Sequence, residues 1–444
     1  MDFEISVESD SESLTSDRES YSFSPRLLTV SAGSKECCIF PTPPCFNDAQ
    51  SITYEPEVVS IGPYHRGKAN LRMFQEHKTI YLIGMLKRFQ SSKLTRAGLK
   101  AAISRVESRA RECYSQAIDL NSQDFVNMMV LDGCFVLELF RKGCEDGGFA
   151  DNDPIYTMSW VQPSLARDFL KLENQIPYFI LQSLYHLTTE RHRKTVALSS
   201  RALKFFSRFM MIPKDAGSIN LEDCHHLLDV VRRAHIDVLT MGVKEKPIHA
   251  VIRFFKQLLD GVEDSSSARK EKDGFHLTRA ISKLRKLNIS VKHTPDDDRF
   301  LAVRFKHGSL LLAELTIDDF ARPFFFNAIV YEQCKRGASS HFTAYAVLLD
   351  CLVNTAQDVE RLCERNVLRN NLGSDKEAAQ FIRQLGKLVR CYPHTFYITD
   401  VFKDIESHYL NKWLVGRAWG SISALAAAIL LAVASQTFYT HYGV

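Results

Sequence analysis

Apolar residues recur at helical spacing through most of the chain. The clearest stretch is 124–142, where an apolar side chain returns every three or four residues and Gly143 follows as a stop signal. The same spacing predicts further helices over 221–240, 247–260, 341–370 and 375–390. The hydrophobic pattern of the middle of the chain therefore predicts a mainly α fold.

A second strong apolar pattern, over 165–187, is interrupted by Pro177. Proline is tolerated in the first turn of a helix but not in its interior. We therefore predict two helices with a break at Glu173, Asn174 and Gln175, whose polar side chains are suited to capping the helix ends.

Strand signals are scarce and concentrate in one place. Two β-rich runs, 300–305 and 310 onward, are joined by a short link that contains Gly308, which predicts a hairpin. Charged breaks at 264–273 and 295–298 indicate exposed linkers. We expect one large helical domain over 26–410 with a minor β-hairpin and a possible linker near 264–273.

The most apolar part of the chain is its C-terminus. Residues 418–444 contain no Asp, Glu, Lys or Arg, and 418–440 form a continuous run of apolar and small residues. As a helix this run would be about 34 Å long, enough to cross a hydrocarbon core of about 30 Å. Its serines and Gln436 make the hydropathy moderate, so a buried core helix is the alternative. We predict a transmembrane anchor over 411–440 and a short tail, 441–444.

The flanks of the run indicate its orientation. Aromatic residues typical of membrane interfaces stand at both ends: Trp413, Trp419, Phe438, Tyr439 and Tyr442. Lys412 and Arg417 precede the run and no Lys or Arg follows it, so the positive-inside rule assigns the N-terminal part to the cytosol. We expect a single-pass membrane protein, in either the plasma membrane or an endomembrane.

Small residues line one face of the predicted anchor at every fourth position. They are Gly420, Ala424, Ala428 and Ala432, and Gln436 continues the face. Small side chains let two helix backbones approach closely, and a glutamine amide can bond across such an interface. We hypothesise a homo- or hetero-oligomeric helix contact here, with alanine as neutral filler as the alternative.

Composition agrees with a cytosolic body. Residues 1–25 are acidic and rich in serine without an apolar core, which predicts a disordered N-terminus rather than a secretory signal. The 11 cysteines lack the dense spacing of a secreted disulfide scaffold, which suits a reducing compartment. The whole chain has a net charge of +4 and its first 24 residues carry −6, so the remainder carries +10. This excess is typical of an ordinary solvated surface, with mild attraction to anionic lipid as the alternative, and we expect no nucleic-acid partner.

The stretch 276–292 has the pattern of an amphipathic helix. Leu277, Ile281, Leu284, Leu287 and Val291 share one helical face, and basic residues crowd the others. Such a helix either lies on an anionic membrane surface or docks on the protein's own core. Both interpretations require a helix that continues to Lys292.

No sequence motif indicates a catalytic or metal site. Phosphate-binding loops, H-E-x-x-H and G-x-S-x-G are absent from the sequence. The cysteines at 37, 38 and 45 and the run Cys224-His225-His226 lack zinc-ligand spacing, and buried thiols with a surface histidine pair are the alternative. We expect no metal and no cofactor. His65 and Glu173 are the titratable residues from which a dispersed hydrolase-like site would be built.

Several ordered motifs resemble the plant family known as domain of unknown function 247 (DUF247, also UPF0481). They lie at 54–67, 132–140, 172–179, 331–334 and 419–439. Their characteristic residues in this chain are Gly62, Pro63, Tyr64, His65, Gly67, Asp132, Gly133, Glu173, Asn174, Gln175, Pro177, Glu332 and Gln333. The chain departs from the family pattern at Cys38–Pro41 and around Ala313 and Glu314.

The resemblance implies a mostly helical protein with a hydrophobic segment close to its C-terminus and no known enzymatic activity. It also implies that some grass relatives serve as pollen-side self-incompatibility determinants. From the residues themselves, Gly62, Pro63 and Gly67 predict a tight turn that orders the loop carrying Tyr64 and His65. We expect a non-enzymatic membrane protein that binds an unknown protein partner in recognition or signalling. A self-incompatibility role and a hydrolase-like enzyme are the alternatives.

Overall fold

The computed structural model describes residues 33–46, 54–89, 94–144, 149–189, 196–240, 290–294 and 299–390, together with 397–398, 400–401, 404–405 and 408. The predicted acidic N-terminus, the helix over 247–260, the linkers at 264–273 and 295–298 and the anchor over 411–440 lie outside these residues.

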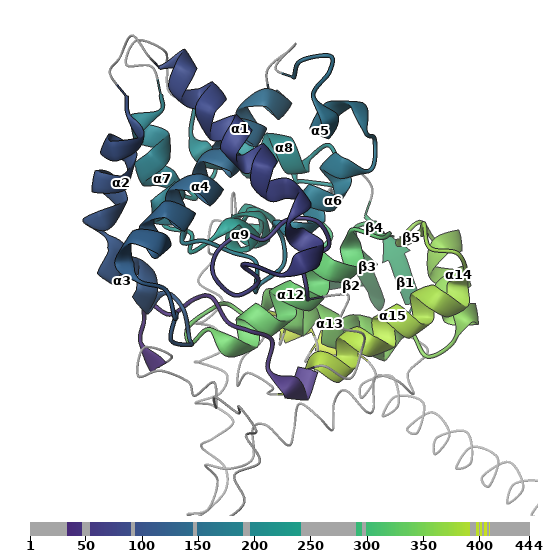
Figure 1. Ribbon diagram of the computed structural model, residues 1–444. Coiled ribbons are helices and arrows are strands. Elements are labelled where there is room, and N and C mark those ends of the chain that lie inside the picture. The colour runs from purple at the N-terminus through teal and green to yellow at the C-terminus, as the bar shows by residue number, and fades with distance from the viewer. Residues whose placement is uncertain are drawn as a thin grey trace, which may run out of the picture.

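The first half of the fold is a group of helices around α4 (Figure 1). Its helices are α1 (Met73–Arg88), α2 (Arg96–Ser104), α3 (Glu107–Glu112), α4 (Ser122–Cys144), α5 (Pro154–Thr157), α6 (Val161–Asp168), α7 (Tyr178–Leu187), α8 (Leu198–Phe206) and α9 (Leu227–Thr240). Short 3-10 turns lie at Pro44–Phe46, Ala69–Leu71 and Lys214–Ser218. The predicted helix over 124–142 is confirmed as α4.

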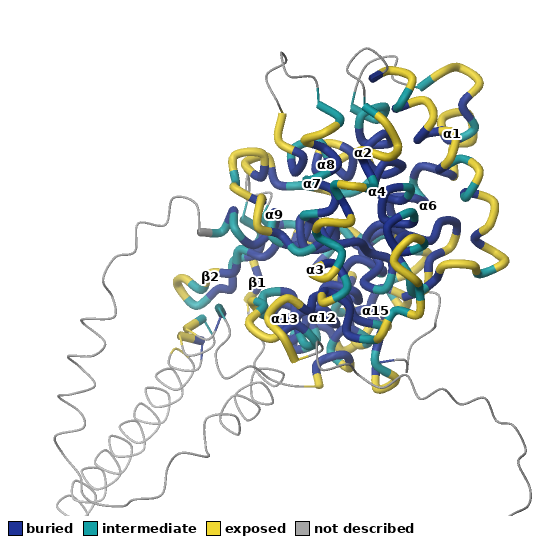
Figure 2. The backbone as a smooth tube through the Cα atoms, turned by 60° about the vertical axis from the view of Figure 1, so that its left-hand side comes forward, coloured by how far each residue is buried: buried dark blue, intermediate teal, exposed yellow. Residues whose placement is uncertain are grey.

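Helix α4 is the centre of this group because it is buried on nearly every side. Phe125, Met129, Phe135 and Phe140 are fully buried, and α1, α2, α7 and α8 all pack against it. The helix starts where the Asn121 side chain accepts a hydrogen bond from the N–H of residue 124 at 2.8 Å. Figure 2 shows α4 buried within the surrounding helices. Its neighbours are thereby arranged around one common core.

The second half contains four helices and two small sheets (Figure 1). The helices are α12 (Ala321–Cys334), α13 (His341–Leu352), α14 (Ala356–Glu364) and α15 (Asp375–Leu388). The strands are β1 (Ser290–His293), β2 (Val303–Lys306), β3 (Ser309–Leu312), β4 (Leu315–Ile317) and β5 (Leu368–Asn370). Helix α9 packs against both α8 and α12, so it joins the two halves.

The predicted hairpin is confirmed. Strands β2 and β3 pair antiparallel, with Val303 opposite Leu312. Their two-residue turn has positive φ at both positions, 50° at His307 and 73° at Gly308, as a tight hairpin requires. The sequence did not predict β1, β4 or β5. In the structure β1 pairs parallel with β3, and β4 pairs parallel with β5.

Two helix predictions are wrong in part, because part of each predicted helix is instead a strand that pairs with a strand distant in sequence. The region 341–370 is two helices and a strand, because Thr355 and Asp358 form a capping box that starts α14 and residues 368–370 pair with β4. The predicted helix over 276–292 does not reach its end, since 290–293 form β1. Residues 276–289 lie outside the described part of the chain.

The break between α6 and α7 is confirmed, and α7 begins directly after Pro177. Among the helices that the structure describes, none is long and apolar enough to cross a membrane. The described residues therefore give a mainly helical body with small sheets, and they do not support a transmembrane helix within that body.

Candidate functional site

The loop 54–67, which carries the longest motif, is held by buried side chains from distant parts of the chain. Asp168 is fully buried, and its carboxylate accepts hydrogen bonds from the backbone N–H groups of residues 57–59 at 2.8 to 2.9 Å. Lys171 is also fully buried, with Nζ 3.5 Å from Oδ1 of Asp168. Buried charges are tolerated when they are paired and hydrogen-bonded, so this pair fixes the loop.

A second buried ion pair holds the same loop from α1 and α4. Nζ of Lys78 lies 2.6 Å from Oδ1 of Asp132, and the two side chains are only 1% and 3% exposed. Lys78 also donates to the carbonyl of Ser60, and Asp132 accepts from the N–H of Gly62 at 2.9 Å. The motif residue Asp132 thus binds loop backbone and a buried cation.

The motif residues between α6 and α7 bind backbone groups from three segments. Asn174 binds the loop at 59–61: its Oδ1 accepts from the N–H of Ile61 at 2.6 Å, and its Nδ2 donates to the carbonyl of Val59 at 3.0 Å. Gln175 donates to carbonyl groups at the end of α6 and accepts from the N–H of Leu227 at 3.1 Å. The prediction that these residues cap the helices around Pro177 is wrong for α7, which has no side-chain cap. Gln175 instead caps the start of α9.

His65 and Glu173, the residues of the alternative hydrolase-like site, are brought together. Nε2 of His65 lies 3.0 Å from Oε2 of Glu173, and the side chains are 4% and 15% exposed. The other carboxylate oxygen accepts from the N–H of Thr42 at 2.7 Å. Burial alone would raise the pKa of Glu173, but His65 and Thr42 outweigh it and lower the pKa. The pair joins three segments in a nearly closed environment.

The remaining motif residues shape the backbone. Gly62 and Gly67 have φ of 79° and 85°, which confirms the predicted tight turn. The carbonyl of Pro63 accepts within this turn, and the hydroxyl of Tyr64 donates to the backbone near residue 39. Gly133 lets α4 approach α7, since a Cβ there would lie 2.4 Å from a leucine methyl group.

The motif residues of α12 bind the ends of other helices. The carboxylate of Glu332 accepts from the N–H groups of Phe342 and Thr343, at 3.1 and 2.8 Å, and thereby caps α13. The amide of Gln333 donates to the carbonyl of Leu388 at 2.8 Å, at the end of α15. Every predicted motif residue therefore has a scaffold contact or a backbone role in the structure.

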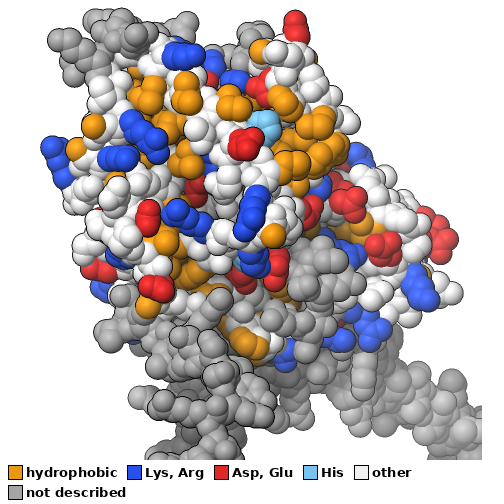
Figure 3. All heavy atoms as spheres, viewed as in Figure 1, with side chains coloured by type: hydrophobic (Ala, Val, Ile, Leu, Met, Phe, Trp, Pro, Cys, Tyr) orange, Lys and Arg blue, Asp and Glu red, His pale blue; other side chains and the backbone are white. Residues whose placement is uncertain are grey.

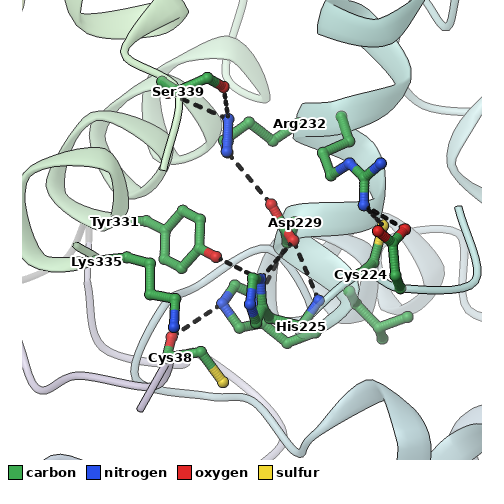
Figure 4. A network of polar contacts seen from close by, with 12 residues as sticks. Cys38, Cys224, His225, Asp229, Arg232, Tyr331, Lys335 and Ser339 are labelled. Carbon is green, nitrogen blue, oxygen red and sulfur yellow. Dashed lines mark hydrogen bonds and ion pairs between the residues drawn. The ribbon is translucent and has the colours of Figure 1, made fainter. Parts of the chain in front are cut away.

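A further polar network joins α9 to α12 and to the N-terminal segment (Figure 4). Nη1 of Arg232 lies 3.4 Å from Glu332 and 3.1 Å from the hydroxyl of Ser339. Lys335 donates to the carbonyl of Cys37 at 2.9 Å. The Lys335 contact joins residues 298 positions apart, the Arg232 contacts join residues 100 and 107 positions apart, and together they stabilise the contact between the two halves.

His226 lies inside this network. The predicted surface histidine pair is wrong for this residue, which is fully buried. Its Nδ1 accepts from the N–H of Asp229 at 3.2 Å, so the ring proton is on Nε2, which lies 3.1 Å from the carbonyl oxygen of Cys38. Burial lowers the pKa of His226 to about 3, and the imidazole is therefore neutral at pH 7.

His225 is the partly exposed member of the pair. Its Nδ1 lies 3.0 Å from Oδ2 of Asp229 and 2.9 Å from the hydroxyl of Tyr331, and 38% of its side chain is exposed. Burial would raise the pKa of Asp229, but His225 and Arg232 outweigh it and lower the pKa. A histidine oriented by a carboxylate can accept a proton. The adjacent Cys224 thiol is buried, and burial raises its pKa, so it stays protonated and is a poor nucleophile.

A buried histidine without a polar partner gives the protein a predicted pH dependence. His235 packs against the rings of Phe300 and Phe324, and neither ring nitrogen has a hydrogen-bond partner among the described residues. Burial lowers its pKa to about 3, below the ordinary value of about 6.5. Between these values the unfolded chain binds more protons, so stability falls as pH falls.

We expect His235→Phe to remove this contribution. When the pH is lowered from 7 to 5, the variant should lose about 2 kcal/mol less of its free energy of unfolding than the wild type loses. Urea unfolding at several pH values measures it. His186→Phe, at an exposed position of α7, is the control and should parallel wild type. A His235→Phe profile parallel to wild type would contradict the assignment.

Helix α1 carries an exposed apolar surface that none of the sequence motifs includes. Met73, Ile80 and Ile83 are 54%, 59% and 48% exposed and fall on one side of the helix, where the exposed Glu76 lies between them. Gly84 beside them has open space where a Cβ would be. Figure 3 shows hydrophobic side chains gathered over α1 and α5. The signal in the sequence is that α1 is apolar on two faces, although one face is enough to dock it on the core.

No metal centre is apparent in the part of the chain that the structure describes, where no three His, Cys, Asp or Glu side chains converge. Cys37 and Cys38 are buried, whereas Cys45 is exposed.

Comparison with known proteins gives one family. The chain matches DUF247, described as plant protein of unknown function, over residues 39–433. It is 31% identical to the UPF0481 protein At3g47200 of Arabidopsis thaliana, over 88% of this chain and 81% of that protein. It is 22% identical to the putative UPF0481 protein At3g02645 of the same plant, over 90% and 89% of the two chains. No solved structure matches the chain.

Proposed function

Because the chain belongs to the DUF247 family of plant proteins of unknown function, we propose a role from its own residues. It is a single-pass membrane protein whose cytosolic helical body acts by binding another protein, in recognition or signalling. The observation that carries the proposal is the exposed apolar face of α1, formed by Met73, Ile80 and Ile83.

This face suits a helix of a partner protein. The three apolar side chains lie along one side of α1 with the exposed Glu76 among them, and such a stripe is recognised by one face of an amphipathic helix. Gly84 leaves room for the partner's backbone to come close. Arg72 and Lys87 stand exposed at the two ends of the stripe. We therefore assign to the partner helix acidic residues at both ends of its apolar stripe.

The motif residues support binding over catalysis. His65 and Glu173 are mostly buried, and Glu173 is engaged by a backbone N–H as well as by His65. The partly exposed His225 has a carboxylate partner but only a buried thiol beside it as a nucleophile. A catalytic residue must reach its substrate, and these side chains instead link segments of the scaffold.

The anchor completes the proposal. The uncharged run 418–440 has the length of a membrane span, and aromatic residues stand at both of its ends. Anchoring confines the α1 face to a membrane surface, where a weak contact between two helices gains effective concentration.

A charge placed on the α1 face tests the proposal. In Ile80→Asp the new carboxylate would be buried unpaired against the partner, so binding should fall at least about tenfold. Ala101→Asp adds the same charge to an exposed position of α2 and is the matched control. Proximity labelling from full-length protein in plant membranes should give proteins that are marked by wild type and Ala101→Asp but lost with Ile80→Asp. The same marked set for all three proteins would overturn the proposal.

A further inference from the structure

A half-open cavity of about 340 Å³ lies where the two halves of the body meet. One wall comes from the residues after α8, including Phe209 and Met210. The rest of the lining includes Phe324 and Phe325 from the first turns of α12 and Leu315 and Thr316 from β4. Cavities of this size between structural units are typical sites for small ligands.

The walls suit a flat or chain-like apolar group. Phe209 is half-buried at the cavity, whereas the rings of Phe324 and Phe325 are almost fully buried and only back the wall. Met210 is half-buried and belongs to no regular element. Methionine side chains are flexible and polarisable, so this wall can adjust to a bound group. Aromatic faces also attract cations.

The polar groups at the cavity are negative. Glu314 and Asp318 line it, and the lining contains no Lys or Arg. Oδ1 of Asp318 accepts from the N–H groups of residues 320 and 321 at 2.9 and 2.8 Å, whereas its Oδ2 has no partner among the described residues. Glu314 pairs with Arg369 at 2.9 Å, and that arginine is 58% exposed. The cavity therefore presents apolar walls and one carboxylate oxygen that is free to accept a donor.

We propose that this cavity binds a small organic amine, with its apolar part against Phe209 and Met210 and its ammonium group at Asp318. The inference is independent of the proposed protein partner, because the α1 face and this cavity share no residue. The ammonium group satisfies Oδ2 of Asp318, whereas a carboxylate of the same size meets two negative side chains.

A matched set of probes tests the charge preference. Binding of 4-phenylbutylamine, 4-phenylbutanol and 4-phenylbutanoate to the full-length chain is measured by equilibrium dialysis. The Met210→Trp variant, in which the larger side chain fills the cavity, is prepared in the same way. Subtracting its signal removes the uptake of each probe by detergent or lipid. We expect saturable binding of the amine at least about tenfold tighter than that of the carboxylate, with the alcohol between them, and none in Met210→Trp.

Asp318→Asn identifies the group that recognises the amine. The asparagine oxygen still caps α12, so the fold is kept while the charge is lost, and unchanged thermal unfolding checks this. The preference for the amine over the carboxylate should fall from at least about tenfold to about threefold or less, whereas Asp319→Asn, at an exposed neighbouring position, should keep it. Equal binding of amine and carboxylate, full binding in Met210→Trp, or an undiminished preference in Asp318→Asn would each overturn the proposal.

Discussion

Replacing Gly62 with alanine is expected to lower the free energy of unfolding by about 3 kcal/mol or more. Gly62 has φ of +79°, a conformation that costs an L-residue about 1 kcal/mol. A Cβ at this position would also lie 2.3 Å from the carbonyl oxygen of Gln175, which is backbone and cannot rotate away. The loop would have to move, and its bonds to Asp132 and Asn174 would be lost with it.

Gly67 provides the control within the same turn. Its φ is +85°, but an added Cβ would meet nothing within 4 Å. Gly67→Ala should therefore cost only the conformational strain, about 1 kcal/mol. Urea unfolding of the full-length chain, followed by circular dichroism, measures both variants. Equal losses for the two would show that the contact between Gly62 and Gln175 does not hold the loop.

The sequence predicted those features of the fold that depend on neighbouring residues. Periodicity located α4 and α15, Pro177 located the start of α7, and the link at Gly308 located the hairpin. Each of these signals lies within the element that it specifies, so no knowledge of the rest of the fold was needed.

Features that depend on distant partners could not be predicted in this way. The bonds from Asp168 to residues 57–59 and from Gln333 to Leu388 join segments far apart in sequence. The parallel pairing of β1 with β3 and of β4 with β5 likewise overrides local helical periodicity. The motif at 54–67 was therefore visible as a pattern, but its role in the scaffold became clear only from its contacts.

The cavity and the α1 face were missed for a related reason. Met210 and Asp318 lie on different segments, and no spacing in the sequence connects them. Ile80 and Ile83 look like core residues in a helix that already buries Phe74, Tyr81 and Met85. Only burial in the folded body separates the apolar residues that serve the core from those left exposed.

Replacing both Leu425 and Ile429 with arginine is expected to move the protein from membranes to the soluble fraction. Leu425 and Ile429 lie near the middle of 418–440, one helical turn apart. Arginine near the centre of a span costs about 2.5 to 3.5 kcal/mol, which a run of moderate hydropathy cannot offset twice. Leu425→Ala with Ile429→Ala is the control and should stay in the membrane, because alanine carries no charge.

Alkaline extraction of membranes from plant cells that express the full-length chain tests whether residues 418–440 anchor the protein in a membrane. An integral anchor resists carbonate at high pH, whereas a peripheral protein is released. We expect wild-type protein in the pellet and the Leu425→Arg, Ile429→Arg variant in the supernatant. Wild-type protein recovered in the supernatant would contradict this expectation.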